Sequence, residues 1–323
     1  MDKRPYLLIT IDTEGDDLWS RPKRITTANI NYLPRFQEIC DSYGFKPTYL
    51  VNYEMACCSA FKEFGLNIIS NKVGEIGMHL HAWNNPPLVP LTKDDYLYQP
   101  YLIEYPHNII SEKIKIITDS LENIFNQKMI SHRAGRWAFN AIYTESLIDQ
   151  GYKVDCSVTP LRSWKNSLGD PNGDGGIDYS FYPNQPYWTD NNGGNKTDSL
   201  LEIPVTIVSQ NNFINYLINN PALPRKCIIN QFHSYIKPIW LRPNGNNLET
   251  MKKILDYKIQ AGDDYAMLTL HSSELMPGGS PTFTTESDIE ILYDHLQNIF
   301  NYSKDIYQPG TLTDYYNYYI KNY

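Results

Sequence analysis

The sequence predicts an α/β fold in which parallel strands alternate with helices. Seven short apolar runs, rich in β-branched residues, have the length and pattern of buried strands. Helical patterns separate several of these runs, and such alternation is typical of parallel βαβ units. Polar residues follow some runs directly, at the ends where parallel sheets carry their active sites. The predicted strands cover approximately residues 6–12, 46–52, 75–82, 129–134, 152–158, 200–206 and 266–272.

Three segments between these strands have the clearest helical patterns. Residues 31–42 carry apolar side chains at helical spacing and stop before Gly44. Residues 111–125 open with a serine that can cap a helix, followed by a glutamate. Residues 144–150 end at Gly151, a residue typical of helix C-termini. We therefore expect a helix over each segment.

The third predicted strand carries two histidines, His79 and His81, two residues apart. Alternate residues of a strand point to the same face, so both imidazoles would aim at one spot. The residues of opposite parity, Ile76, Met78 and Leu80, have the apolar character that a buried face needs. A histidine pair at a strand end is often only a polar edge, so this pair alone does not define a site.

Two other predicted strands end in residues of related chemistry. The first strand leads into Asp12 and Glu14, again two residues apart, and the last strand ends at His271. Two histidines and a carboxylate with an open position make a typical hydrolytic zinc or iron site. The remaining acid and histidine could then act as an acid/base pair.

Five segments resemble, in order along the chain, the motifs of the polysaccharide deacetylase (NodB-like, carbohydrate esterase family 4-type) family. That family carries Thr-Phe-Asp-Asp-Gly, His-x-x-x-His, Arg-x-x-Pro-Tyr, an Asp-centred strand and Leu-x-His. The resemblance runs from residue 6 to about residue 280 and implies a distorted (β/α)7 barrel of the NodB/polysaccharide deacetylase type. The matching segments are residues 10–15 (Thr-Ile-Asp-Thr-Glu-Gly), 77–81 (Gly-Met-His-Leu-His), 133–137 (Arg-Ala-Gly-Arg-Trp), 154–157 (Val-Asp-Cys-Ser) and 268–271 (Leu-Thr-Leu-His).

The segments also depart from the family pattern, as in a divergent branch. Asp-Thr-Glu replaces the adjacent aspartates, so we assign Glu14 as the metal ligand and Asp12 as the base. The second histidine stands at i+2, and the family's i+4 position is Trp83. No proline follows the arginine motif, so either Arg133 or Arg136 could support the base.

The resemblance implies a metal-dependent hydrolase that removes N-acetyl groups from an amino-sugar-containing saccharide. Glu14, His79 and His81 would hold a divalent ion, which we expect to be Zn²⁺ or another divalent transition metal. His271 would be the acid that protonates the departing amine, oriented by Asp155. The predicted substrate contacts are Trp83, Trp137 and Leu270.

Residues 1–323 are expected to form a single polysaccharide deacetylase-like catalytic domain. Long loop insertions at about 84–108 and 159–199 interrupt the alternation of strands and helices. Loops of that length in a compact domain are usually functional or mobile. Both follow strands whose C-terminal ends point at the predicted site, so both could form walls of a substrate cleft.

Composition excludes several other classes of protein. The formal net charge of -8 argues against nucleic-acid binding, and no apolar run approaches the ~18 residues of a membrane span. The five cysteines lack metal-site spacing, and residues 1–5 enter the first strand without an apolar leader segment. We expect a cytoplasmic location unless a leader precedes this sequence. The oligomeric state is left undetermined.

Three alternative functions stay open. The first is a non-sugar C–N hydrolase of the same fold, acting on an amide or a cyclic ureide. The second is a catalytically inactive glycan-binding homologue, and the third is a metal-free sugar-binding or interaction protein with structural histidines. Acetate release tests the first alternative, and metal content tests the third.

His132, which faces away from Arg133 on a strand, is expected to pack against a helix.

Overall fold

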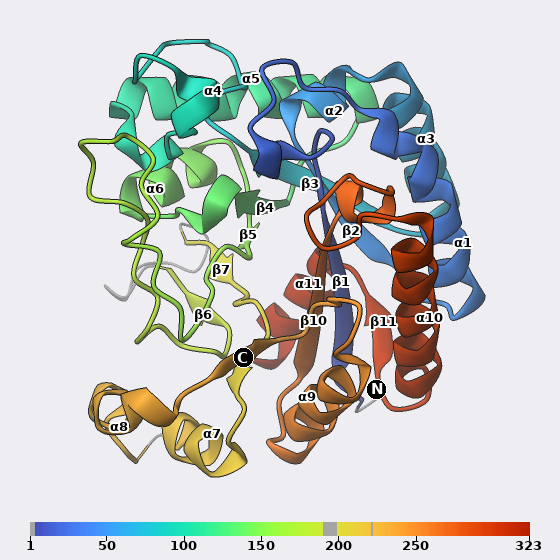
Figure 1. Cartoon of the computed structure of the whole chain (residues 1–323), viewed down its shortest axis with the longest axis vertical. Coiled ribbons are helices and arrows are strands. Elements are labelled where there is room, and N and C mark those ends of the chain that lie inside the picture. Colours follow the sequence, from blue (N-terminus) through green and yellow to red (C-terminus); the bar gives the residue numbers. More distant parts are fainter. Residues whose placement is uncertain (1–3, 190–198, 221) are drawn as a thin grey trace.

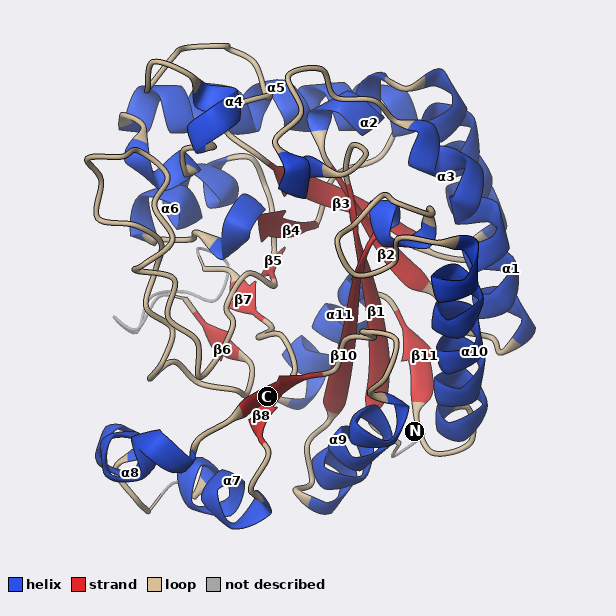
Figure 2. Cartoon of the chain, viewed as in Figure 1, coloured by secondary structure: helices blue, strands red, loops and turns tan. Residues whose placement is uncertain are grey.

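A curled sheet of nine strands forms the centre of the molecule in the computed structural model, which describes residues 4–189, 199–220 and 222–323. The seven predicted strands all lie in this sheet and run parallel, in the order β10-β1-β2-β3-β4-β5-β7 (Figure 1). Helices surround the sheet (Figure 2), so the predicted distorted (β/α)7 barrel is confirmed. These strands are β1 (Tyr6–Thr13), β2 (Pro47–Val51), β3 (Glu75–Leu80), β4 (Ser131–Ala134), β5 (Val154–Asp155), β7 (Leu201–Glu202) and β10 (Tyr265–His271).

Four further strands are too short to show a period in the sequence. β6 (Tyr187–Trp188) pairs antiparallel with β7 at the sheet edge. β11 (Gln308–Gly310) lies beside the first residues of β1, which β2 leaves unpaired on that side. β8 (Ile207–Ser209) and β9 (Pro238–Trp240) form a separate antiparallel pair.

The barrel is distorted because the ladder is interrupted between β7 and β10. β5 and β7 are shorter than predicted because their register slips after Ile203. The N–H of Ile203 donates to the carbonyl of Asp155, but the N–H of Val205 donates to the carbonyl of Val158. Single hydrogen bonds cross the gap. The N–H of Met267 donates to Thr206 Oγ1 over 2.8 Å, and the N–H of Leu241 donates to the carbonyl of Thr206 over 3.1 Å. The sheet therefore closes only through irregular backbone.

The three predicted helices are present, with different starts. α5 begins at His107 instead of Ser111, because the carbonyl of Pro106 accepts the first helical hydrogen bonds. α6 begins at Ala141 because the side chain of Asn140 caps the N–H of Tyr143. The helices of the described residues are α1 (Leu33–Ser42), α2 (Tyr53–Cys57), α3 (Ser59–Asn71), α4 (Asp95–Tyr98), α5 (His107–Phe125), α6 (Ala141–Asp149), α7 (Asn212–Asn219), α8 (Arg225–Phe232), α9 (Leu248–Gln260), α10 (Glu286–Ser303) and α11 (Leu312–Asn322). None of these helices has both the length and the apolar character that crossing a membrane requires.

Alternate side chains along each strand point either to the outer core, between the sheet and the helices, or to the interior of the barrel. In β3 the side chains of Ile76, Met78 and Leu80 belong to the large apolar core that includes residues of the outer helices, as predicted. Leu8 of β1 and Met267 of β10 belong to a second cluster inside the barrel. Side chains that share the parity of these inner residues reach the interior, and at the C-terminal ends of the strands they reach the site.

The last helix closes the opposite end of the barrel. Leu312 and Tyr315 of α11 are fully buried in the inner cluster. Glu75, the first residue of β3, fixes this helix. Its carboxylate accepts hydrogen bonds from the N–H and hydroxyl of Thr313 over 2.9 and 2.8 Å, and from the hydroxyl of Ser131 over 2.7 Å.

Glu75→Ala should lower the free energy of unfolding by about 1–3 kcal/mol, because several hydrogen bonds to a charged acceptor are lost together. Chemical denaturation at neutral pH measures the change. Glu63→Ala on the exposed surface of α3 is the matched control and should stay within about 0.5 kcal/mol of the wild type. Equal stabilities of the two variants would show that Glu75 does not fix α11.

Candidate active site

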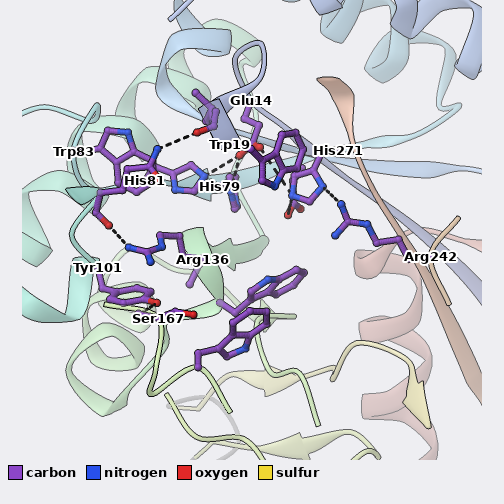
Figure 3. Close-up of a pocket in the computed structure, with 16 residues that line it drawn as sticks. Glu14, Trp19, His79, His81, Trp83, Tyr101, Arg136, Ser167, Arg242 and His271 are labelled. Atoms are coloured by element: carbon purple, nitrogen blue, oxygen red, sulfur yellow. Dashed lines mark hydrogen bonds and ion pairs between the residues drawn. The ribbon is translucent and has the colours of Figure 1, made fainter. Parts of the chain in front are cut away.

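A cavity of about 320 Å³ opens at the C-terminal ends of β1, β3, β4 and β10 (Figure 3). Both predicted insertions contribute to its wall, the first through Gln99 and Tyr101 and the second through Trp164 and Ser167. Most of the predicted site residues also line it. These are Asp12, Glu14, His79, His81, Trp83, Arg136, Trp137 and His271.

The three residues predicted as metal ligands converge on one point. The Nε2 atoms of His79 and His81 are 3.1 Å apart. The Glu14 Oε2 atom lies 2.8 Å from His81 Nε2 and 3.5 Å from His79 Nε2. All three side chains are almost fully buried. The i+2 spacing therefore still allows both imidazoles to reach the same spot, because β3 directs them to one face.

Neighbouring groups orient both imidazole rings. His79 Nδ1 lies 2.8 Å from the carbonyl of Arg133, and a carbonyl can only accept, so Nδ1 carries the proton. Nε2 of His79 therefore presents its lone pair to the cluster, as in a metal-binding histidine. His81 is held by packing, since a Cβ on Gly135 would lie 2.5 Å from its Nδ1 and the Trp83 ring lies 4.3 Å from its ring. Glycine at position 135 thus permits this close approach.

The electrostatics of the cluster favour a cation. Burial raises the pKa of Glu14, but hydrogen bonds with His79 and His81 outweigh this and hold that pKa well below its usual range. Burial lowers the pKa of His81 to about 4. Burial also lowers the pKa of His79, but Asp12 and Glu14 raise it above its ordinary value. Two imidazole nitrogens and one carboxylate oxygen suit Zn²⁺ or a related divalent metal, and among the described residues they form the one such cluster.

Asp12 stands beside this cluster in contact with Arg133. Nη1 of Arg133 donates to Asp12 Oδ1 over 2.6 Å, and both side chains are buried. Burial raises the pKa of Asp12, but the Arg133 guanidinium, with help from His79, holds that pKa below its ordinary value. Of the two arginines left open by the sequence, Arg133 is the one that contacts Asp12.

Arg136 does not support the base, which corrects the alternative assignment. Arg136 and Trp137 both have positive φ angles, 54° and 64°, so the chain turns sharply after β4. The turn carries the Arg136 guanidinium to the cavity wall, where it donates to the carbonyls of Gln99 and Leu168. It also lies over the ring of Tyr101, 4.1 Å from the ring centroid.

His271 lies beside the ligand cluster, with its Nε2 4.0 Å from Glu14 Oε1. Its Nε2 is 3.6 Å from Asp12 Oδ2, and its ring makes an edge contact with Trp19. Its Nδ1 is 2.9 Å from Nη2 of Arg242 and 3.3 Å from Oε2 of Glu274. Arg242 and Glu274 also pair with each other over 2.8 Å, and the pair lowers the pKa of Glu274 to about 2 against the effect of burial.

Asp155 does not orient His271, contrary to the prediction. It pairs in register with His132 on the neighbouring strand, and the His132 Nδ1 atom lies 2.6 Å from Asp155 Oδ1. The other nitrogen of His132 is 2.8 Å from the hydroxyl of Tyr143 in α6, so His132 packs against a helix as expected. Glu274 and Arg242 take the place assigned to Asp155. Sequence reasoning missed both, although Glu274 stands three residues after His271.

The three predicted substrate contacts divide between two environments. Trp83 and Trp137 line the cavity. Leu270 does not, because its parity in β10 is opposite to that of His271 and directs it into the outer core. The prediction for Leu270 is therefore wrong.

No protein-family model matches the sequence, and no curated protein matches it. Several solved structures share the fold. A candidate polysaccharide deacetylase from Mycobacterium smegmatis has 15% identity and a TM-score of 0.51, over 98% of this chain and 91% of that one. The Puue allantoinase has 12% identity and a TM-score of 0.51, over 98% and 90% of the two chains. A 4-α-glucanotransferase from Thermococcus litoralis has 13% identity and a TM-score of 0.51, over 99% of this chain and 40% of that one.

The resemblance to polysaccharide deacetylases thus extends from the motifs to the fold, at 15% sequence identity. The three similar structures have different named activities. Because one fold can serve several reactions, the fold does not select among them. The function must therefore be argued from the side chains of the cavity.

His79→Ala and His81→Ala should each purify with little bound metal, because either change removes one of three convergent ligands. Elemental analysis of protein purified without chelator measures the stoichiometry. His107→Ala, at the exposed start of α5, is the control and should keep the wild-type value. Wild-type stoichiometry in both cluster variants would exclude this site as the metal centre.

Proposed function

We propose that this chain is a metal-dependent hydrolase that removes N-acetyl groups from an amino-sugar-containing saccharide, as a divergent relative of the polysaccharide deacetylases. The observation that carries the proposal is the grouping of Glu14, His79 and His81 beside the Asp12–Arg133 pair and His271. Zn²⁺ is the proposed ion. Bound there, it would polarise the acetyl carbonyl and lower the pKa of a water toward ~7.

Asp12 is the proposed general base. Its Oδ2 lies 3.6 Å from His271 Nε2, while its Oδ1 accepts a hydrogen bond from Arg133. The buried guanidinium keeps the carboxylate ionised, so Asp12 can accept the proton of the attacking water. Arg133 acts through Asp12 and is a positioning residue, since it does not line the cavity.

His271 is the proposed general acid. The acid form of the ring is the imidazolium, which carries a proton on both nitrogens. Its Nε2 faces Asp12 and the cavity, so it can deliver a proton to the departing amine and leave a neutral imidazole. Its Nδ1 lies 3.3 Å from Glu274 Oε2, which can accept the second proton's hydrogen bond, and 2.9 Å from Arg242 Nη2. Glu274 balances the charge of Arg242 and holds it in place.

The lining of the cavity supports a sugar as the substrate. Trp83, Tyr101, Trp137 and Trp164 present aromatic rings, and Arg136 and Arg242 add N–H groups. Flat rings pack against apolar faces such as those of a pyranose, and the polar groups can bind its hydroxyls. We extend the proposal to a single catalytic domain over residues 1–323. All five cysteines are free thiols, and on that basis we propose a cytoplasmic location.

A hydrolase of another amide or of a cyclic ureide is the second candidate. The specific observation in its favour is the fold shared with an allantoinase. An acetate-release screen over N-acetylated monosaccharides and oligosaccharides tests the proposed function against this alternative. We expect acetate from at least one N-acetyl sugar. Hydrolysis of a ureide without any acetate would favour the second candidate, and metal binding without turnover of either substrate class would favour an inactive glycan-binding protein.

Asp12→Asn should lower kcat by about 10²–10⁴-fold while leaving bound metal unchanged, because it removes a base and not a ligand. Glu14→Gln should weaken metal binding, because it replaces the anionic ligand by a neutral one. Elemental analysis and acetate release, measured on the same preparations, separate the two effects. The reverse pattern would mean that the two carboxylates have exchanged roles.

His271→Ala should lower kcat for an N-acetyl sugar by about 10²–10⁴-fold with metal content intact. The loss should be much smaller for an aryl acetate, because its leaving group departs without a proton. Parallel assays of both substrates measure the difference, and His233→Ala on the exposed surface is the control. Equal losses on the two substrates would remove His271 from the acid role.

A further inference from the structure

A second cavity of about 520 Å³ adjoins the catalytic one. Trp137, Trp164 and Arg242 line both cavities, so the two meet at these side chains. The floor of the second cavity includes the end of β9 and the start of α9. A ligand in the catalytic cavity that extends past the two tryptophans would enter the second cavity.

On the Arg136 side of the catalytic cavity, the described parts of the two insertions are tied together. Arg136 binds the carbonyls of Gln99 and Leu168, one from each insertion. Glu104 accepts hydrogen bonds from the N–H groups of Tyr101 and Asp170, which makes a second tie. The hydroxyl of Tyr101 adds a third, to the carbonyl of Ser167 over 2.7 Å. The packing is tight, since a Cβ on Gly169 would lie 2.3 Å from the Glu104 carboxylate.

The second cavity has the chemistry of a sugar-binding site. Trp240 lines it and not the catalytic cavity, and its ring makes an edge contact with Trp137 at 5.7 Å between centroids. The Arg162 guanidinium lies over the rings of Trp164 and Trp240, which fixes their positions. Side chains of Asn244, Thr250 and Thr282 also line the cavity and can bind hydroxyl groups.

We propose that this second cavity is a subsite for the sugar next to the residue that loses its acetyl group. The preferred substrate is then an N-acetylated oligosaccharide of at least two residues. Its reacting residue is terminal, because the joined insertions close the Arg136 side. This inference rests on the proposed function and deepens it, since it names the length and the reacting position of the saccharide.

Trp240 gives the decisive test, because it lines only the second cavity. Acetate release from N-acetylglucosamine and from its β-1,4-linked dimer and trimer is measured for wild type, Trp240→Ala and Trp240→Phe. Wild type should favour the dimer over the monomer by about tenfold or more in kcat/KM. Trp240→Ala should lower kcat/KM for the dimer by about three- to tenfold, mainly through KM, and leave the monomer within about twofold. Trp240→Phe should recover part of the loss.

The reacting position is checked by mass spectrometry of the partly deacetylated trimer. A terminal amine is expected, and deacetylation of the middle residue would overturn the terminal position. Trp188→Ala is the control, since Trp188 lines neither cavity and should change no substrate preference. Equal losses on monomer and dimer in Trp240→Ala, or no loss at all, would overturn the subsite while acetate release by wild type still supports the proposed function. If wild type releases no acetate from any of these sugars, the proposed function fails and the subsite fails with it.

Discussion

The guanidinium of Arg133 is buried in the interior of the barrel, where an unpaired charge would be very costly. Each of its three nitrogens therefore needs an acceptor, and the surrounding strands supply one for each. Asp12 and Thr10 of β1 accept over 2.6 and 2.8 Å, and the carbonyl of Cys156, just after β5, accepts over 3.1 Å. One side chain thus links β4 to both flanks of the site. The same contacts fix the position and the charge of Asp12, on which the rest of the proposed chemistry depends.

Strand parity made the centre of the site predictable from the sequence. Asp12, His79, His81 and His271 all come together because a residue's place in a strand decides which face it reaches. The same rule, applied to β10, would have excluded Leu270, whose neighbour His271 points inward. Leu270 belongs to the Leu-x-His motif of the family, but in this chain its side chain packs in the outer core.

Other parts of the site lie in turns and short strands, whose sequences show no repeating pattern of apolar and polar residues. The turn after β4 uses positive φ angles at two residues that are not glycine. No residue type in this segment therefore indicates that the Arg136 side chain turns away from Asp12. Arg242, which contacts His271, follows the three-residue strand β9. A strand this short shows no alternation of apolar and polar residues, so it could not be predicted from the sequence. The contact of Glu274 with His271 could have been predicted, because residues three positions apart meet within one turn.

The pairing of β1 has a consequence for synthesis on the ribosome. β1 is the first strand to be made, yet its neighbour along one whole side is β10, and β11 lies beside its first residues on the other side. Both β10 and β11 come from the last fifth of the chain. Until those residues emerge, an edge of β1 that is apolar and rich in unpaired amide groups stays open to other chains. Contacts of such large sequence separation also form slowly. The nascent chain therefore carries an aggregation-prone edge for most of its translation, and protection of that edge by chaperones should govern how much folded protein a cell recovers.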